Sequence, residues 1–430
     1  MRKTSILILL GITLSCTPFT NTSCQGNDCT DNNKASHTHQ PVNSELQHVH
    51  LIFHHGDRSS MHPIPEIYNN FQEVWPQGLG ELTGIGVRQQ FLLGQWLRRK
   101  YGHFIPETYT SSTYRIKSMK KDRSLMSAMA NSAGFYSQSL SPLDEFNVHW
   151  SPVPVHILPH PSDFLRGRNR CPRLNSLKHL RMHMHDSIKL ERQHKSLFTM
   201  LTNVTGLHVD RFNIGKLADF LKCMKGSNVS LPGWCTEQVL HEIFEVDNFY
   251  WTEKYAKSLE VARLQSGLLF HSIVEHINRI IREKSINLPN NIKMSNKHMM
   301  VYSVDDIHVA SILTAFHISN NKTIEYASVV SLEVYGPPEP VDASQLIVKL
   351  FYKRGWEDEN GEYLSMPICY AGEFLDGCPL PVVLERLESL AIHPKYYAVE
   401  CSPLLAERNN NSNTTDIWHK PEVYGYFAFS

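Results

Sequence analysis

Two short segments of the chain combine nucleophilic, cationic and acidic side chains. The first, FHHGDRSS at residues 53–60, places His55 directly after an apolar run and Arg58 three residues later. An imidazole in such a place could act as a nucleophile, and a guanidinium beside it could bind an anion through two parallel hydrogen bonds. Gly56 between them would let the backbone approach that anion. Alone, the segment is a weak indication, because histidine also occurs as an ordinary buried residue.

The second segment is YSVDD at residues 302–306, which also follows an apolar run and precedes a helical pattern. An aspartate at such a junction could donate a proton to a leaving group. The commoner role of aspartate there is to cap the N-terminus of the helix. The residues by themselves leave both interpretations open.

Alternating strands and helices must position these two segments. Residues 48–55, 107–113 and 298–304 predict buried strands, and residues 83–101 and 122–136 predict helices. Ligands of open α/β sheets bind beyond the carboxyl ends of the strands. The two segments are therefore expected at such strand ends.

A long helical block interrupts the alternation at residues 180–285. A hairpin over 327–353 and a last helix over 381–391 follow it. The pattern predicts an α/β protein in which helices flank a mixed central sheet and a helical cap is inserted. The expected organisation is a flexible segment at 23–46, an α/β core at 47–160 and 290–405, a cap at 161–289 and a tail at 406–430. One apolar face is expected on the last helix of the block, formed by Ala262, Leu269, Ile273, Ile277 and Ile280.

The N-terminus predicts a secreted protein, with the lysosomal lumen as the alternative. Arg2 and Lys3 precede a ten-residue apolar run, which is typical of a signal peptide, here at residues 1–22. That run is too short to span a bilayer, and no later run reaches 18 apolar residues, so no transmembrane anchor is expected. Sequons fit this compartment, and glycosylation is expected at Asn203, Asn228 and Asn321.

Composition excludes further classes of protein. Lys+Arg and Asp+Glu both number 42, so no basic field favours nucleic acid as a partner.

Nine cysteines become eight when Cys16 leaves with the signal peptide, an even number suited to disulfides. No CxxC pair occurs, and the histidine pairs HTH, HVH and HMH give little support for a metal. His48 and His50 alternate along a strand and so share one face, but no metal site is expected.

Several segments between residues 48 and 404 together resemble the histidine acid phosphatases of the prostatic and lysosomal type. HLIFHHGDRSS is similar to the RHGxRxP motif of that family, and YSVDDIHVASIL is similar to its YSxHDxT segment. DRSLMSAMANSAGFY resembles its arginine-bearing helix, and MPICYAGEFLDGCPLPVVLERL resembles its C-terminal disulfide loop. The resemblance implies a phosphoglycerate mutase-like α/β fold with an inserted cap.

The resemblance also implies a mechanism, hydrolysis of small phosphate monoesters in two steps without a cofactor. His55 would attack phosphorus and form a phosphohistidine, and Asp306 would protonate the leaving alcohol. Arg58 and Arg123 would bind the phosphate oxygens, whose negative charge they stabilise. Members of the family are often dimers, although no interface is visible in this sequence.

Several positions depart from the family pattern. His54 stands in place of the first arginine of the motif, and Asp305 in place of a second phosphate-binding histidine. Ser60 replaces the proline of the motif, and residues 114–121 are interpreted as an insertion before Arg123. His54 would still carry a positive charge when protonated, below about pH 6.5.

Asp305 is the more serious change. An ionised carboxylate about 4 Å from a phosphate oxygen would repel it by up to ~4 kcal/mol at an effective dielectric of ~20. Asp305 could avoid this by sharing a proton with Asp306. Activity would then collapse as pH rises past the titration of this pair. His308, three positions further on, is expected to be an ordinary helix residue.

The sequence therefore supports two functions. The first is an acid phosphatase whose activity is reduced by the changes at His54 and Asp305. The second is a secreted, catalytically inactive relative that binds phosphoesters.

The resemblance implies three of the disulfides. Cys171–Cys401 and Cys369–Cys378 match pairs of the family. Cys223 matches a family cysteine whose partner position is Val329 here, which leaves Cys235 as its expected partner. Cys24 and Cys29 then remain and could pair with each other.

Overall fold

The computed structural model describes residues 44–403, apart from residues 140, 142, 149, 158–170, 286–298, 319–320, 338–342 and 370–376. The described residues belong to one compact unit. The expected signal peptide, the Cys24–Cys29 pair and the C-terminal tail lie outside them. Among the described helices, none combines the length and the apolar character that a membrane span requires.

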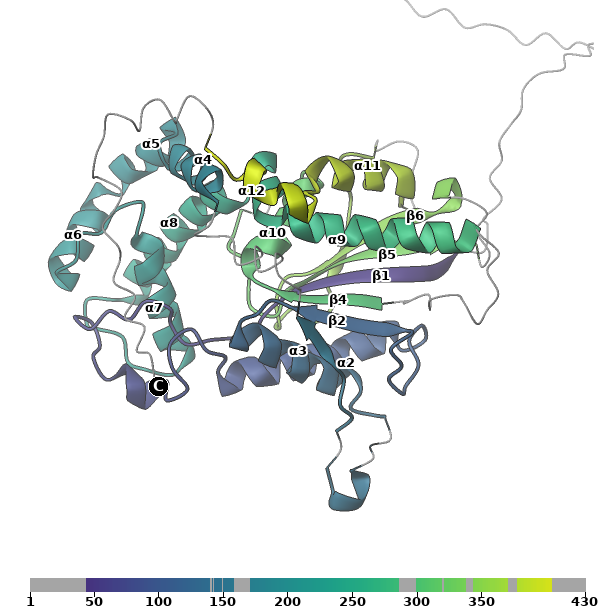
Figure 1. The fold of residues 1–430 in the computed structure, drawn as a ribbon. Coiled ribbons are helices and arrows are strands. Elements are labelled where there is room, and N and C mark those ends of the chain that lie inside the picture. Colours follow the sequence, from purple (N-terminus) through teal and green to yellow (C-terminus); the bar gives the residue numbers. More distant parts are fainter. Residues whose placement is uncertain are drawn as a thin grey trace, which may run out of the picture. The chain divides into compact units, whose positions relative to one another are not determined.

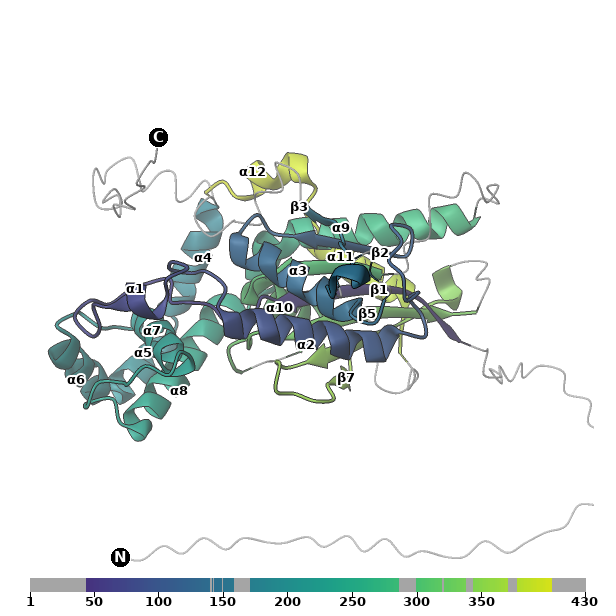
Figure 2. The ribbon, with the colours of Figure 1, turned by 90° about the horizontal axis from the view of Figure 1, so that it is seen from below.

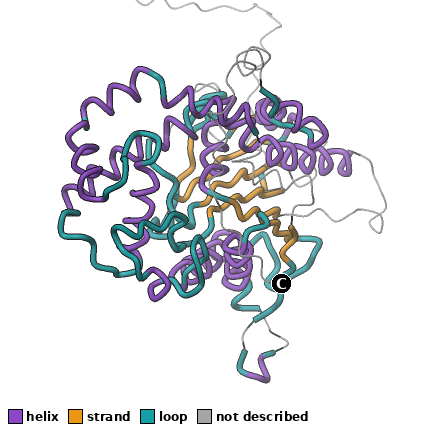
Figure 3. Tube along the Cα trace, turned by 60° about the vertical axis from the view of Figure 1, so that its left-hand side comes forward, coloured by secondary structure: helices purple, strands orange, loops and turns teal. Residues whose placement is uncertain are grey.

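A mixed β-sheet lies between layers of helices, as expected (Figures 1 and 3). Its strands are β1 (Glu45–His54), β2 (Tyr114–Ser118), β3 (Val155–Ile157), β4 (Met299–Val304), β5 (Val329–Gly336), β6 (Ile347–Lys353), β7 (Glu362–Leu364) and β8 (Cys378–Pro379). They run in the order β3-β2-β4-β1-β5-β6-β7, with β8 beside β6. The first four of that order are parallel, and β5 and β6 form the expected antiparallel hairpin.

Strands β1 and β4 bring the two sequence segments together. Their parallel register pairs His54 with Val304, so both strands end at the same level. Both are buried along most of their length, as expected of central strands covered on both faces. The loop after β1 and the start of the helix after β4 therefore meet at one edge of the sheet.

The second strand differs from its prediction. It is β2 at Tyr114–Ser118, whereas residues 107–113 form turns and coil in which Thr110 accepts backbone bonds from Thr113 and Tyr114. In β2 the buried Tyr114 and Ile116 alternate with half-buried Arg115 and Lys117, the period of a strand. The segment interpreted as an insertion is thus the strand that leads to Arg123.

Two helical layers cover the sheet (Figures 1 and 2). On one face lie α2 (Gly84–Tyr101) and α3 (Asp122–Phe135), which pack on Val49, Leu51 and Phe53 of β1. On the other face lie α9 (Leu259–Ser285), α10 (Asp306–Ala315) and α11 (Leu380–Leu390), which pack on Ile52. The expected apolar face of α9 forms, because Ala262, Leu269, Ile273 and Ile277 are buried and Ile280 is half-buried.

The remaining helices form a separate core. They are α1 (Phe71–Val74), α4 (Pro172–Met182), α5 (His185–Gln193), α6 (Lys195–Thr205), α7 (Ile214–Gly226) and α8 (Glu237–Tyr255). Most of their buried apolar residues cluster together with Ile64 and Trp75, whereas Leu174 of α4 belongs to the cluster on the sheet. Because α9 packs on the sheet, the helices that form this cap core end with α8, before the expected boundary at residue 289.

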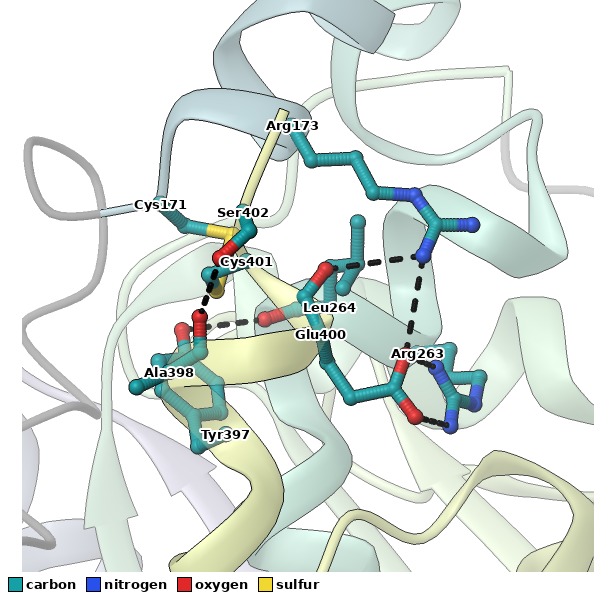
Figure 4. Close-up of a disulfide and its surroundings, with 9 residues drawn as sticks. All are labelled: Cys171, Arg173, Arg263, Leu264, Tyr397, Ala398, Glu400, Cys401 and Ser402. Atoms are coloured by element: carbon teal, nitrogen blue, oxygen red, sulfur yellow. Dashed lines mark hydrogen bonds and ion pairs between the residues drawn. A yellow bond between two sulfur atoms is a disulfide. The ribbon is translucent and has the colours of Figure 1, made fainter. Parts of the chain in front are cut away.

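Two of the expected disulfides are present and one is not. Cys171–Cys401 joins the start of α4 to the residue after α12 (Tyr397–Glu400), beside the bidentate pair of Glu400 and Arg263 (Figure 4). Cys369–Cys378 closes its short loop. Cys223 and Cys235 are both free and buried, so the prediction of a bond between them was wrong.

Candidate active site

The loop after β1 is held by polar side chains of the two helices beneath it. Gln89 of α2 accepts a hydrogen bond from the backbone nitrogen of Asp57 at 2.7 Å, and Gln90 donates to the carbonyl of His54 at 2.9 Å. Ser127 of α3 accepts from the nitrogen of Gly56 at 3.2 Å. These bonds satisfy backbone groups that the end of the strand leaves without ladder partners.

Gly56 lets the loop after β1 pack closely against helix α2. A Cβ atom at this position would lie 2.3 Å from the carbonyl oxygen of Gly86, so the loop and the first turn of α2 touch backbone to backbone. A side chain at either glycine would separate them, since a Cβ on Gly86 would lie 2.1 Å from the Asp57 carbonyl oxygen. The glycine expected to approach phosphate is therefore required by helix α2.

His55 presents one ring nitrogen as an acceptor. Its Nδ1 lies 2.8 Å from the carbonyl oxygen of Gly56, so Nδ1 carries the proton and donates it. Its Nε2 accepts a hydrogen bond from Nε of Arg123 at 3.1 Å. Burial, the His54 ring and the Arg123 guanidinium lower the pKa of His55 well below its usual value. The ring is therefore neutral, with the lone pair of Nε2 directed at a cation.

Arg123 lies in the first turn of α3 and spans the site. Besides its contact with His55, it donates to the carbonyl oxygen of Gly80 at 3.1 Å, and Nη2 lies 3.5 Å from Oδ1 of Asp305. Gly80 has a φ of +73°, a conformation that favours glycine. The turn at Gly80 thereby aims its carbonyl at the guanidinium.

Asp305 points into the site instead of capping the helix. It occupies the N-cap position of α10, yet its side chain makes no capping hydrogen bond. Oδ2 accepts from Nζ of Lys121 at 2.5 Å, and Oδ1 lies 3.8 Å from Nε2 of His55. Burial opposes the charged form, but Lys121 and Arg123 outweigh it and hold the pKa of Asp305 well below its usual value. Asp305 is therefore ionised.

The carboxyl group of Asp306 has other hydrogen-bond partners than that of Asp305. Oδ1 accepts from the backbone nitrogen of Ile307 at 2.8 Å, and Oδ2 accepts from Nε1 of Trp251 in α8 at 3.2 Å. The idea that the two aspartates share a proton was wrong, because they have different partners and Asp305 is held ionised by Lys121.

Arg58 is already engaged with a carboxylate of the cap. Its two terminal nitrogens donate to Asp219 of α7 at 2.8 and 3.2 Å, a bidentate pair. Its charge still contributes to lowering the pKa of His55, so it lies near that ring. Free Cys223 belongs to the same contact, since its thiol donates to the carbonyl of Arg58 at 3.4 Å.

His54 does not replace the missing arginine. Its Nδ1 lies 2.9 Å from the carbonyl oxygen of Glu325, and its ring centroid lies 4.2 Å from that of His55. Burial lowers the pKa of His54, although Asp306 acts in the opposite direction. The expected compensation by an imidazolium is therefore disfavoured.

Sequence reasoning missed Lys121 and Asp219. Lys121 directly precedes α3, two residues before Arg123, and a correct placement of β2 would have put both at the end of that strand. Asp219 lies within an ordinary helical pattern, and no local signal marks it. His308 is fully buried with Nδ1 2.8 Å from the Ser266 hydroxyl, as expected of an ordinary helix residue.

The site and fold together define a class of protein, in which a neutral histidine at the end of a central parallel strand faces an arginine. The family model of the histidine phosphatase superfamily (branch 2) matches residues 45–366. The chain therefore belongs to this family.

Curated relatives agree with this family, and solved structures share the fold. The chain is 30% identical to the prostatic acid phosphatase of Homo sapiens, over 86% of this chain and 91% of that protein. It is also 30% identical to the lysosomal acid phosphatase of Xenopus laevis, over 78% of this chain and 74% of that protein. The phytase of Hafnia alvei, in complex with myo-inositol hexakis sulphate, shares the fold with a TM-score of 0.59 at 13% identity, covering 85% of this chain and all of that one.

Proposed function

We propose that this protein is an acid phosphatase that hydrolyses phosphate monoesters through a phosphohistidine on His55. The observation that carries the proposal is the state of the His55 ring, because a proton on Nδ1 and a lone pair on Nε2 are what an attack on phosphorus requires. The Arg123 guanidinium, 3.1 Å from Nε2, lies where it can stabilise the oxygens of the transferring group.

The reaction would proceed in two balanced steps. Nε2 of His55 forms a bond to phosphorus as the ester P–O bond breaks, and Asp306 gives its proton to the departing alkoxide. Water then attacks phosphorus, Asp306 accepts a proton from it, and the N–P bond breaks to release phosphate. Asp306 suits this role because it lies close enough to affect the titration of His54.

The electrostatic balance of the site explains how Asp305 is tolerated. Asp219 and Asp305 offset the charges of two of the cations Arg58, Lys121 and Arg123. Among these five groups the cations outnumber the carboxylates by one, which favours a phosphate less than three unpaired cations would. We infer a functional enzyme whose affinity for phosphate is reduced.

Hydrolysis of p-nitrophenyl phosphate between about pH 3 and 7 tests the proposal. The His55→Ala variant should lose roughly 10⁴-fold in kcat. The Asp306→Asn variant should lose on the order of 10²-fold on an alkyl phosphate but much less on the nitrophenyl ester, whose leaving group needs no proton. Equal activity of His55→Ala and the unchanged protein would refute the phosphohistidine.

A second candidate function is phosphoester binding without turnover, and the ionised Asp305 favours it. Its carboxylate lies 3.8 Å from Nε2 of His55, where its charge opposes the placement of a phosphoryl group for attack by that nitrogen. The Asp305→His variant should raise kcat/KM by about tenfold if this repulsion limits the enzyme. Calorimetric binding of inorganic phosphate by the unchanged protein, together with no hydrolysis in any of these variants, would support the binding protein instead.

We further propose that the protein enters the secretory pathway and is then secreted or kept in the lysosomal lumen. The apolar run after Lys3 supports this, as do the exposed side chains of Asn203, Asn228 and Asn321. Two relatives are named for the prostate and the lysosome. Expression in animal cells, followed by N-terminal sequencing and enzymatic deglycosylation of the product, tests the cleavage and the three glycosylation sites.

A further inference from the structure

Three histidines meet between β1 and α9, on the face of the sheet opposite α2 and α3. His48 and His50 lie two residues apart on β1, and His276 lies on α9, which runs along this face (Figure 1). Each offers a ring nitrogen, and these nitrogens lie within 4.8 Å of one another. His50 precedes the nucleophile by five positions, about 16 Å along an extended strand, so the cluster is separate from the phosphatase site.

The cluster is enclosed by the protein. His48, His50 and His276 are 3%, 0% and 5% exposed. Among the described residues, neither ring nitrogen of His50 has a hydrogen-bond partner. A buried polar side chain without such a partner is costly and calls for an explanation, and a bound ion is one of the usual ones.

The ring chemistry suits one class of ligand. Neutral imidazole is the form that binds metals, and a set of imidazoles without carboxylates suits zinc better than magnesium or calcium. The nearby charge of Lys117 on β2 opposes a cation, although its Nζ turns to the hydroxyl of Ser272 at 3.4 Å.

We propose that His48, His50 and His276 bind a zinc ion that joins helix α9 to strand β1. Two nitrogens on one tetrahedral zinc lie about 3.3 Å apart, so the rings need to close by roughly 1.5 Å at their widest separation. Rotation of the His276 side chain on α9 toward the two strand residues would supply this movement. Because the site is enclosed and lies away from His55, its role is to stabilise the fold.

The test uses the untagged full-length protein, stripped with a chelator and then titrated with zinc. We expect one zinc per chain, a rise in the melting temperature on zinc addition and, with cobalt(II) in its place, the intense visible absorption of a tetrahedral site. The His276→Leu variant should bind zinc more weakly by on the order of a hundredfold and lose the thermal shift. His48→Leu is the second variant, should His276→Leu fail to fold.

The matched control is the double variant His183→Ala/His185→Ala, which removes two histidines of the cap that lie outside the cluster. It should keep the stoichiometry, the affinity and the thermal shift. The proposal is overturned if the unchanged protein binds no stoichiometric zinc, or if folded His276→Leu or His48→Leu binds it equally well. Loss of binding in the control variant would also overturn it, since the zinc would then lie on the cap.

Discussion

The two helical layers on either side of the sheet bury different kinds of side chain. On α9, the face toward the sheet is largely apolar and includes Leu269, Phe270 and Ile273. On α2, the buried face includes Gln89 and Gln90, while apolar Ile85 and Leu92 are 46% and 44% exposed.

The difference reflects what each layer supports. Helix α9 covers the middle of the sheet, where its buried side chains are mostly apolar, apart from Gln265, Ser266 and His276. Helices α2 and α3 lie under the loop that carries His55, where the backbone of His54, Gly56 and Asp57 needs hydrogen-bond partners. A buried polar face on a helix next to a strand end is thus a sign that the helix positions a functional loop.

The largest expected effect lies in the apolar layer. Phe270→Ala on α9 should lower the free energy of unfolding by about 3–5 kcal/mol, because it removes a fully buried aromatic side chain and leaves a cavity. Activity per folded molecule should not change. Urea denaturation measures the loss, and Met129→Ala on α3, where the side chain is 54% exposed, should stay within about 0.5 kcal/mol. Equal losses in both variants would contradict the contrast.

The next largest effect on stability is expected at glycines where a helix lies very close to a neighbouring segment. A Cβ on Gly134 of α3 would lie 1.9 Å from the backbone oxygen of Phe91, whereas a Cβ on Gly267 of α9 would meet only the side chain of Ile392, at 2.6 Å. Gly134→Ala should therefore destabilise the protein by about 3 kcal/mol and Gly267→Ala by about 1 kcal/mol, since a side chain can move more easily than backbone. The comparison fails if the order of the two unfolding midpoints is reversed.

A smaller effect on stability, but a clear effect on activity, is expected at Gln89. Gln89→Leu leaves the buried nitrogen of Asp57 without its partner, which should cost about 1–2 kcal/mol. Because the loop carries His55, kcat should fall by about tenfold. Gln95→Leu on another face of α2 is the control and should leave kcat unchanged. Unchanged kcat in Gln89→Leu would show that α2 does not position the loop.

The smallest effect is a pH dependence of stability that comes from Asp57, in the loop after β1. Burial raises the pKa of Asp57, and the Thr83 hydroxyl offsets this only in part. A carboxyl with a raised folded-state pKa costs stability once it ionises, so the protein should lose stability as pH rises from about 4, the ordinary value. Asp57→Asn should remove about 1 kcal/mol of that loss while matching the unchanged protein below pH 4. Unfolding curves at several pH values measure this. The same dependence of the free energy of unfolding on pH in both proteins would refute the prediction.

The sequence by itself determined the central strands and the position of His55 at the end of one of them. Long apolar runs in β1 and β4 have few alternatives to a buried parallel sheet, and His55 follows the first of them directly. The family motifs and the disulfides Cys171–Cys401 and Cys369–Cys378 could also be assigned from the chain.

Only the tertiary structure decided how the charges of the site are paired. Lys121 and Asp305 are 184 positions apart in the chain, and Arg58 and Asp219 are 161 apart. Coulomb energy depends on separation in space and on burial, neither of which a local pattern contains. The free state of Cys223 was also decided by the tertiary structure, because its thiol contacts the backbone of Arg58 where α7 meets the loop after β1.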